Sequence, residues 1–141
     1  MTQAIDCVGV VCFRDDHVLL IKRGKAPRYG QWSIPGGRIE AGESEIHAAQ
    51  RELCEETSIL ARSFTKIETL KVDFGSGPYR LHDYAAIWVS GDPVAGDDAI
   101  EAEFVPISEI DNRIEWSETQ RIIREGYEIV ADILHLKSRN T

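Results

Sequence analysis

The sequence predicts an α/β domain of the α+β kind, in which two main helices pack on a sheet. Segments rich in β-branched and apolar residues recur between turn-forming residues, as strands do. Two longer segments instead repeat apolar residues at helical spacing. A chain of 141 residues with 43% hydrophobic residues is long enough to bury a core, so we expect one domain over residues 1–141.

The first two strands should form a hairpin. Residues 4–13 (AIDCVGVVCF) are apolar and β-branched, residues 14–16 supply a polar turn, and residues 17–22 (HVLLIK) return. A basic loop punctuated by glycine and proline follows over residues 23–31.

The rest of the chain alternates between strands and helices. We expect a short strand at 32–34, a helix at 44–57, a long strand at 59–74 with a break near Ser63, strands at 79–89 and 102–105, and a helix at 117–136. A turn at 75–78 and an acidic loop at 91–99 join them, and residues 137–141 should be frayed. Helices placed among strands in this way favour helices packed on one sheet.

Charge and composition exclude several functional classes. The net charge of -8 argues against general binding to a nucleic-acid backbone, which needs clustered Lys and Arg. No apolar run approaches the length of a membrane span, and the N-terminus lacks the pattern of a signal peptide. Cys7, Cys12 and Cys54 lack metal-like spacing and are expected to be reduced and mostly buried, as in a cytoplasmic protein.

The helix predicted at 44–57 concentrates negative charge on one face. Glu52, Glu55 and Glu56 are spaced so that their carboxylates share a stripe, and Arg51 is their nearest counter-charge. A hard divalent cation would relieve this repulsion, because Mg²⁺ and Mn²⁺ favour carboxylate, carbonyl and water oxygens. The alternative is a solvated, glutamate-rich surface. An adjacent stripe should face the core: Ile46, Ala49 and Leu53.

The segment before this helix suits a metal site. Gly36 and Gly37 let the backbone approach closely and offer carbonyl oxygens. Ser44 is the expected N-cap. Glu43, just before it, suits the positive end of the helix and is placed to reach Arg51 or a metal.

Taken together, these residues resemble the Nudix box. Gly37 is followed after five residues by Glu43, and after seven more by Arg51-Glu52, then Leu53, Glu55-Glu56 and Ile59. The preceding WSIPGG is also similar to the family's approach to the box. The one departure is Ser58, where the family has Gly. A left-handed helix end there would cost Ser roughly 1 kcal/mol or less. The resemblance implies an α/β/α sandwich with a mixed sheet between helices.

The resemblance also implies an activity. Nudix hydrolases use Mg²⁺ or Mn²⁺ to cleave a nucleoside diphosphate linked to another moiety, by attack of water at phosphorus. By family position, Glu55 and Glu56 are the main metal ligands together with the Gly36 carbonyl. Glu52 is a third ligand or the base, and Arg51 with Glu43 orients the site.

Further site residues are expected outside the box. The 91–103 segment should bring another acid to the metal, with Asp98 first, then Asp97 and Glu101. Glu101 is also a candidate for binding substrate. Arg23 and Lys25 are placed to meet substrate phosphates. An ordinary solvated acidic loop and a basic surface loop are the alternatives. Structural roles are favoured for other side chains. Trp32 is expected in packing rather than base stacking, and Tyr79 and Tyr84 in the core, with a pocket wall as the alternative. His82 is expected on a strand with its hydrogen bonds satisfied, the alternative being that it faces the cavity or solvent, and His47 is expected on the surface.

The partner implied is a small nucleoside diphosphate derivative, with neither nucleic acid nor membrane. ADP-ribose or another nucleoside diphosphate sugar and a nucleoside triphosphate both stay open. The proline that ADP-ribose enzymes often carry beyond the box is absent around residues 72–74, whereas RGKAPRYGQWSIPGG and GDDAIEAEFVPISEI resemble ADP-ribose pyrophosphatase-like sequences. Homodimers are common in the family, but nothing in the sequence requires one. The competing function is a catalytically silent Nudix-like module that senses a nucleotide or binds a protein. The retained carboxylates favour the enzyme.

Overall fold

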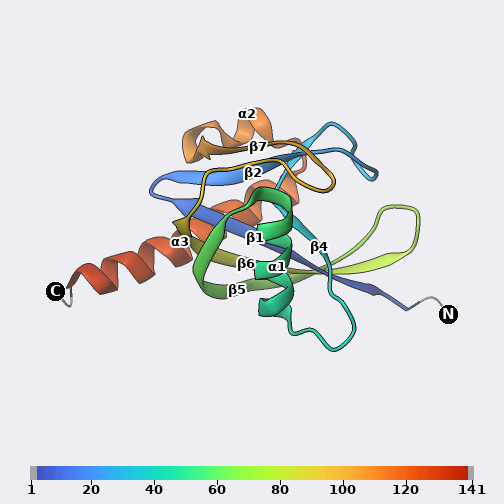
Figure 1. Ribbon diagram of the computed structural model, residues 1–141, viewed down its shortest axis with the longest axis horizontal. Coiled ribbons are helices and arrows are strands. Elements are labelled where there is room, and N and C mark those ends of the chain that lie inside the picture. The colour runs from blue at the N-terminus through green and yellow to red at the C-terminus, as the bar shows by residue number, and fades with distance from the viewer. Residues whose placement is uncertain (1–2, 140–141) are drawn as a thin grey trace.

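A mixed β-sheet with helices on both faces forms the centre of the molecule (Figure 1). The computed structural model describes residues 3–139. Its elements are β1 (Ile5–Arg14), β2 (His17–Arg23), β3 (Trp32–Ser33), β4 (Gly36–Arg38), α1 (Glu45–Thr57), β5 (Leu60–Asp73), β6 (Pro78–Ser90), β7 (Ala99–Pro106), η1 (Ile107–Glu109), α2 (Ile110–Arg113) and α3 (Ser117–Arg139). The predicted α+β class and α/β/α layering are confirmed.

The sheet joins segments that lie far apart in the sequence. Its strand order is β3-β2-β1-β6-β5, with β4 also paired to β1 and β7 to β2. β1 and β2 form the predicted hairpin, in which Phe13 faces Val18. β1 runs parallel to β6, from Ile5 beside Tyr79 to Phe13 beside Ile87. Because β4 pairs with the other side of β1, only β1 lies between the first half of β6 and the glycine-rich β4.

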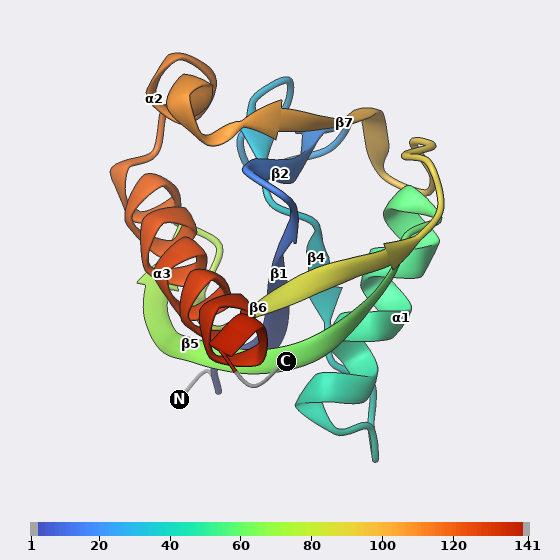
Figure 2. The same ribbon diagram turned by 90° about the vertical axis from the view of Figure 1, so that its left-hand side faces the viewer.

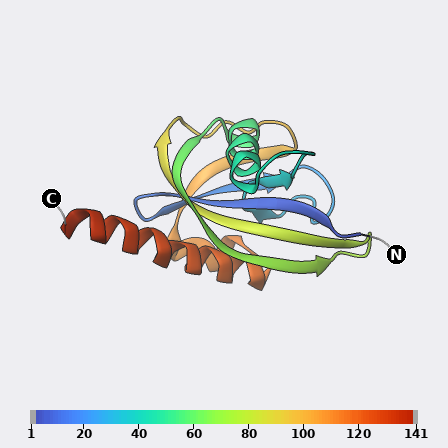
Figure 3. The same cartoon turned by 90° about the horizontal axis from the view of Figure 1, so that it is seen from below.

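Two hydrophobic clusters cover opposite faces of the sheet (Figure 2). On one face Val11, Phe13 and Ala85 pack with Ile122 and Ile123 of α3. The other face packs against α1, with a cluster made of Val8, Val10, Cys12, Leu19, Ala48, Ala49, Leu53, Ile59 and Ala86. The alternation along β1 follows from the two-residue period of a strand. The last turns of α3 extend past the sheet (Figure 3).

Helix α1 has the ends that the sequence predicts. The Ser44 hydroxyl accepts a hydrogen bond from the His47 N–H at 3.1 Å. Ser58 closes the helix in the left-handed conformation, with φ of 63°, and its N–H donates to the Cys54 carbonyl. The expected inward position of Ile46 is wrong, because its side chain is 48% exposed in the first turn, beyond the edge of the packed face.

Several elements differ from the prediction. β4 was missed because a strand of two glycines and an arginine carries no β-branched or alternating signal. The short helices η1 and α2 were also missed, and β7 is longer than expected because it pairs along β2. The break in β5 occurs as expected, since Ser63 has φ of 59° and the register shifts there. Helix α3 includes residues 137–139, which were expected to fray, while residues 140–141 lie outside the described residues.

The cysteines are free, as expected, but only partly buried. Cys12 is buried and Cys7 half-buried, whereas Cys54 is exposed on α1, so its expected burial is wrong. Within the described part of the chain, the search for a helix of membrane-spanning length and apolarity finds none.

Candidate active site

Arg51 connects the carboxylates around α1. Its Nε and Nη2 donate to the two oxygens of Glu43 at 2.7 and 2.8 Å. Its Nη1 donates to Glu52 at 2.7 Å and lies 3.3 Å from Glu55. The Arg51 guanidinium holds the pKa of Glu43 down at about 2. One arginine therefore ties the segment before the helix to the acidic face of the helix.

Glu52 lies against the backbone of β4. A Cβ atom added to Gly37 would sit 2.4 Å from the Glu52 carboxyl carbon, so only glycine leaves room for this carboxylate. Burial raises the pKa of Glu52 against the lowering effect of Arg51, and the charges of Glu55 and Asp97 add to the rise. Glu52 thus interacts with the Arg51 cation and with the charges of Glu55 and Asp97, and the missing side chain of Gly37 leaves room for its carboxylate.

Glu56 is the most buried carboxylate of the helix face. It is 5% exposed and accepts a hydrogen bond from the Gly36 N–H at 2.7 Å. Burial raises the pKa of Glu56 to about 7. Gly36 is also confined, because a Cβ there would sit 2.2 Å from the Val8 carbonyl oxygen. The close packing of β4 against β1 therefore aims a backbone N–H at Glu56.

The loop after β6 docks on the end of α1. The N–H groups of Val94 and Gly96 donate to the carbonyls of Thr57 and Glu56 at 3.0 and 2.9 Å, which satisfies groups left open at a helix end. This docking places Asp97 where its charge acts on Glu52. Asp98, the first choice from the sequence, instead accepts a hydrogen bond from Lys25 at 2.6 Å.

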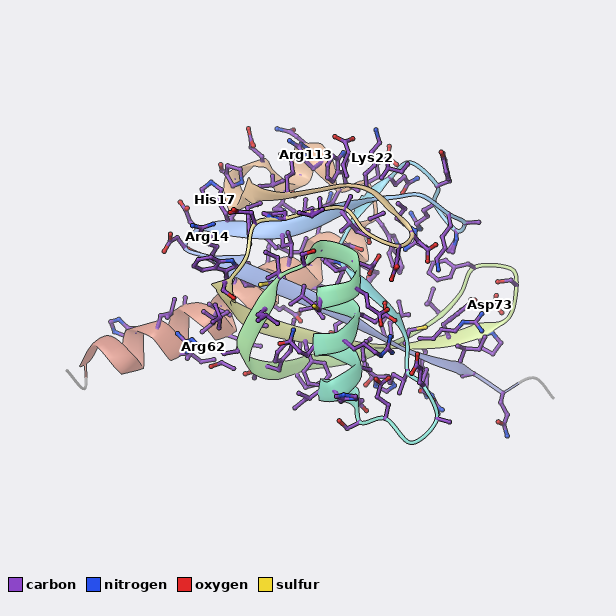
Figure 4. The ribbon with its side chains drawn as sticks, viewed as in Figure 1. Arg14, His17, Lys22, Arg62, Asp73 and Arg113 are labelled. Carbon is purple, nitrogen blue, oxygen red and sulfur yellow. The ribbon has the colours of Figure 1, made fainter. Side chains whose placement is uncertain are left out.

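A cavity of about 410 Å³ opens beside these groups. Five of the predicted site residues line it: Arg23, Lys25, Gly36, Glu56 and Asp98. Arg51, Glu43, Glu52 and Glu55 gather around α1 without being part of its lining. Glu101 is not part of the cavity lining and lies 3.5 Å from the Lys22 ammonium. Lys22 is labelled in Figure 4, beside Arg113 at the upper edge of the molecule. The structure therefore gathers every predicted site residue except Glu101.

The aromatic and histidine side chains have structural contacts, as expected for most of them. Trp32 packs against the α3-side core and lies under the Arg113 guanidinium at 4.8 Å. Tyr84 is buried and donates to Glu45 at 2.8 Å. His82 hydrogen-bonds Asp6 at 2.9 Å, and His47 is exposed. Tyr79 instead lines the cavity.

The cavity residues that sequence reasoning missed include Arg28, Phe74, Asp83 and Trp116. Asp83 is 5% exposed, and burial raises its pKa to about 7. The available signal was its position in β6, where an acid stands among the apolar residues of YAAIWV. The aromatic residues gave no signal, because a turn and a loop bring them to the cavity from distant parts of the chain.

The donor set suits a hard divalent cation. The glutamates of the α1 face offer more carboxylate oxygens than Arg51 can bond, and such oxygens are the ligands that hard cations prefer. Gly36 and Gly37, which we call the glycine cradle, have no side chains, and at Gly37 this lets the Glu52 carboxylate lie close to the backbone of β4. Within residues 3–135, no three His, Cys, Asp or Glu side chains already lie close enough to hold a metal. Arg51 instead bonds Glu52 and Glu55 here, at 2.7 and 3.3 Å.

Two known proteins are similar to this chain in sequence. An ADP-ribose pyrophosphatase of Methanocaldococcus jannaschii is 34% identical over 103 residues, covering 69% of this chain and 59% of that protein. An 8-oxo-(d)GTP phosphatase of Mycolicibacterium smegmatis is 28% identical over 98 residues, covering 70% of this chain and 30% of that protein. The chain thus spans less than two thirds of the length of either relative.

Solved structures share the fold. A MutT NUDIX hydrolase from Burkholderia pseudomallei is 25% identical, with a TM-score of 0.78 over 88% of this chain and 98% of that one. The NUDIX domain of Shewanella oneidensis NrtR, complexed with ADP ribose, is 21% identical, with a TM-score of 0.79 over 92% and 90% of the two chains. The NUDIX domain profile matches residues 5–125. With its glutamate helix, its glycine cradle and this match along most of its length, the chain belongs to the NUDIX family.

Proposed function

We propose that this chain is a Mg²⁺- or Mn²⁺-dependent pyrophosphohydrolase that cleaves a nucleoside diphosphate linked to another moiety. The observation that carries the proposal is the acidic face of α1, where Arg51 joins Glu52 to Glu55 and where Glu56 lines a cavity that Arg23 and Lys25 also line. A pyrophosphate is densely anionic, so its hydrolysis needs cations to neutralise oxygens and acids to handle the attacking water. Acids and cations both line this cavity, with Glu56 as an acid and Arg23 and Lys25 as cations.

The box residues divide the work by position. Glu55, Glu56 and the Gly36 carbonyl would hold the divalent ion, with Glu52 and Asp98 as further ligands. When bound, the ion would neutralise phosphate oxygens and make a bound water more acidic. Glu52 is also a candidate base, because its carboxylate is partly buried and close to Glu55. Arg51 and Glu43 keep these groups oriented through their paired hydrogen bonds.

The loop cations would meet the substrate phosphates. Arg23 is anchored by its Nε, which donates to the Pro27 carbonyl at 2.6 Å, and Lys25 is paired to Asp98. Both line the cavity, so phosphate oxygens entering it would find them already placed. Glu101 would need a change in its pairing with Lys22 to contact substrate, which makes it the weakest member of the proposed set.

The substrate classes supported are ADP-ribose or another nucleoside diphosphate sugar, and a nucleoside triphosphate. The named activities of the M. jannaschii and M. smegmatis relatives support one class each. We place the activity in the cytoplasm, in keeping with three free cysteines. A homodimer stays a prediction.

The test is turnover on a panel of nucleoside diphosphate derivatives and nucleoside triphosphates with Mg²⁺ or Mn²⁺. Wild type, Glu55→Gln and the exposed control Glu128→Gln would be compared, and products separated by chromatography. We expect turnover of one class that collapses in Glu55→Gln and persists in Glu128→Gln. Metal and nucleotide binding without turnover of any compound would refute the hydrolase and favour a nucleotide-sensing module. Failure to bind metal at all would refute the metal site.

A further inference from the structure

Asp83 is a buried acid without a hydrogen-bond partner. It lies on β6, is 5% exposed and lines the cavity. No described residue forms a hydrogen bond with its carboxyl group, and the charges that act on it come from Glu68 and Arg121. Buried polar groups are almost always hydrogen-bonded, because leaving one unpaired costs about 1 to 3 kcal/mol. An unpaired acid facing a cavity therefore indicates a ligand group that pairs with it.

The backbone around Asp83 is built to leave it this space. Gly9 is its parallel partner on β1, and a Cβ there would sit 2.4 Å from Asp83 Oδ1 and 2.9 Å from Ile34 Cδ1. The carboxyl group therefore lies over the Gly9 backbone. Gly9 also pairs with Gly36 on its other side, so the acid stands two strands away from the β4 glycines. Asp83 alternates with Ala85 and Ile87 on β6, so it lies on the face of the sheet that α3 covers, and it lines the same cavity as Glu56 of α1.

An aromatic wall lines the same cavity. Phe74 lies 5.7 Å from Trp116 and 5.8 Å from Tyr79 between ring centroids. The Arg28 guanidinium is 4.6 Å from the Trp116 ring, and its buried Nε has no hydrogen-bond partner among the described residues. Aromatic rings and a guanidinium plane are the surfaces on which nucleobases stack. A nucleobase is a flat ring with polar groups on its edge, so it would stack on this aromatic wall and offer its edge to Asp83.

We propose that Asp83 and the wall of Phe74, Tyr79 and Trp116 form a nucleobase subsite that takes adenine, with Asp83 reading the edge of the ring. This inference rests on the proposed function, because it assigns the base of the nucleoside diphosphate substrate. The phosphates would then extend from the subsite toward Arg23 and the box, within the one cavity of about 410 Å³.

Adenine fits the hydrogen-bonding capacity of this acid. Burial and Glu68 raise the pKa of Asp83 to about 7, so the group keeps its proton in mildly acidic solution. A protonated acid offers one donor and one acceptor side by side. The adenine edge presents one acceptor, N1, and one donor, the N6 amino group, so a single acid satisfies it. Guanine adds its N2 amino group, which needs a further acceptor. The other acids that line the cavity are already paired: Glu118 accepts from Arg121 at 2.6 Å, Glu56 from the Gly36 N–H at 2.7 Å and Asp98 from Lys25 at 2.6 Å.

The test is the binding of AMP and GMP without divalent metal, measured by calorimetry. The two ligands share ribose and phosphate, so their affinity ratio reports the base. Wild type should prefer AMP by about tenfold or more, the usual discrimination of a two-bond contact to a base edge. Asp83→Leu should weaken AMP binding by about tenfold to a hundredfold. Asp83→Asn keeps one donor and one acceptor, so it should rescue AMP binding to within a few-fold.

Two results would overturn the subsite: equal or stronger binding of GMP by wild type, or AMP affinity unchanged in Asp83→Leu. Absence of AMP binding by wild type would overturn it as well. Melting curves verify that each variant is folded. If Asp83→Leu does not fold, the preference of wild type for AMP over GMP decides whether the subsite takes adenine. AMP binding that depends on Asp83, with no turnover of any substrate, would leave the subsite standing and refute the hydrolase. Hydrolysis of substrates at the same rate whatever their base would leave the hydrolase standing and refute the subsite.

Discussion

Replacing Asp83 with asparagine should change how the stability of the fold depends on pH. The side chain is buried on β6, and burial together with the charge of Glu68 on β5 raises its pKa from 3.8 to about 7. Arg121 on α3 lowers this pKa, but its guanidinium is already bonded to Glu68, Glu118 and Glu125. The substitution keeps the shape of the side chain and removes its titration.

The sign follows from which state holds the proton. Between the unfolded and folded pKa values, the folded chain keeps the Asp83 proton and the unfolded chain releases it. The stability contributed by this proton is complete below about pH 4 and is lost as pH rises to about 7. Each pKa unit corresponds to about 1.4 kcal/mol, so the full shift of about three units amounts to about 4 kcal/mol. About 3 kcal/mol of this falls between about pH 5 and pH 8.

The assay is urea unfolding of wild type and Asp83→Asn across that pH range, followed by circular dichroism. The variant should gain about 3 kcal/mol over wild type from about pH 5 to pH 8, with the rise ending near pH 7. The exposed Asp92→Asn serves as the baseline for removing one surface carboxylate. A difference between Asp83→Asn and wild type that is flat with pH, like the baseline, would refute the reasoning.

Three further substitutions test the site and its supports. Ser58→Gly should raise the melting temperature by a few degrees, about 1 kcal/mol or less, because φ is 63° there; Ser58→Ala should show no such gain, and a less stable glycine variant would argue against strain at this helix end. Gly37→Ala should lower hydrolytic activity with little change in melting temperature, because the new methyl group displaces the end of the flexible Glu52 side chain; unchanged activity would contradict this. Arg51→Lys should lower activity by about tenfold or more, because lysine cannot bond both Glu43 oxygens and Glu52 together, and equal kcat/KM values would exclude the orienting role.

The box was readable from the sequence because its chemistry is local. Glu52, Glu55 and Glu56 share a face through helical spacing alone, and the caps at Ser44 and Ser58 depend on residues within one turn. The Arg51–Glu43 contact spans eight residues across one helix start. Such features need no knowledge of how the sheet is assembled.

Other features depend on contacts between distant segments. The positions of the acids of the 91–99 loop follow from how that loop docks on α1, with Asp97 where its charge acts on Glu52 and Asp98 bonded to Lys25. β4 exists because β1 offers it a partner, and a glycine-rich segment has no strand preference of its own.

The sequence by itself determined the fold class, the capped glutamate helix and the family, since each rests on periodicity or on spacing within a short stretch. Only the tertiary structure decided that Asp83, Phe74 and Trp116 share a cavity with the box. The parallel pairing of β1 with β6 sets Asp83 over Gly9, and the chain returns at residue 116 to close the cavity. Burial is a property of the assembled sheet and helices, so an acid that looks ordinary in the sequence becomes an unpaired group facing a cavity only after folding.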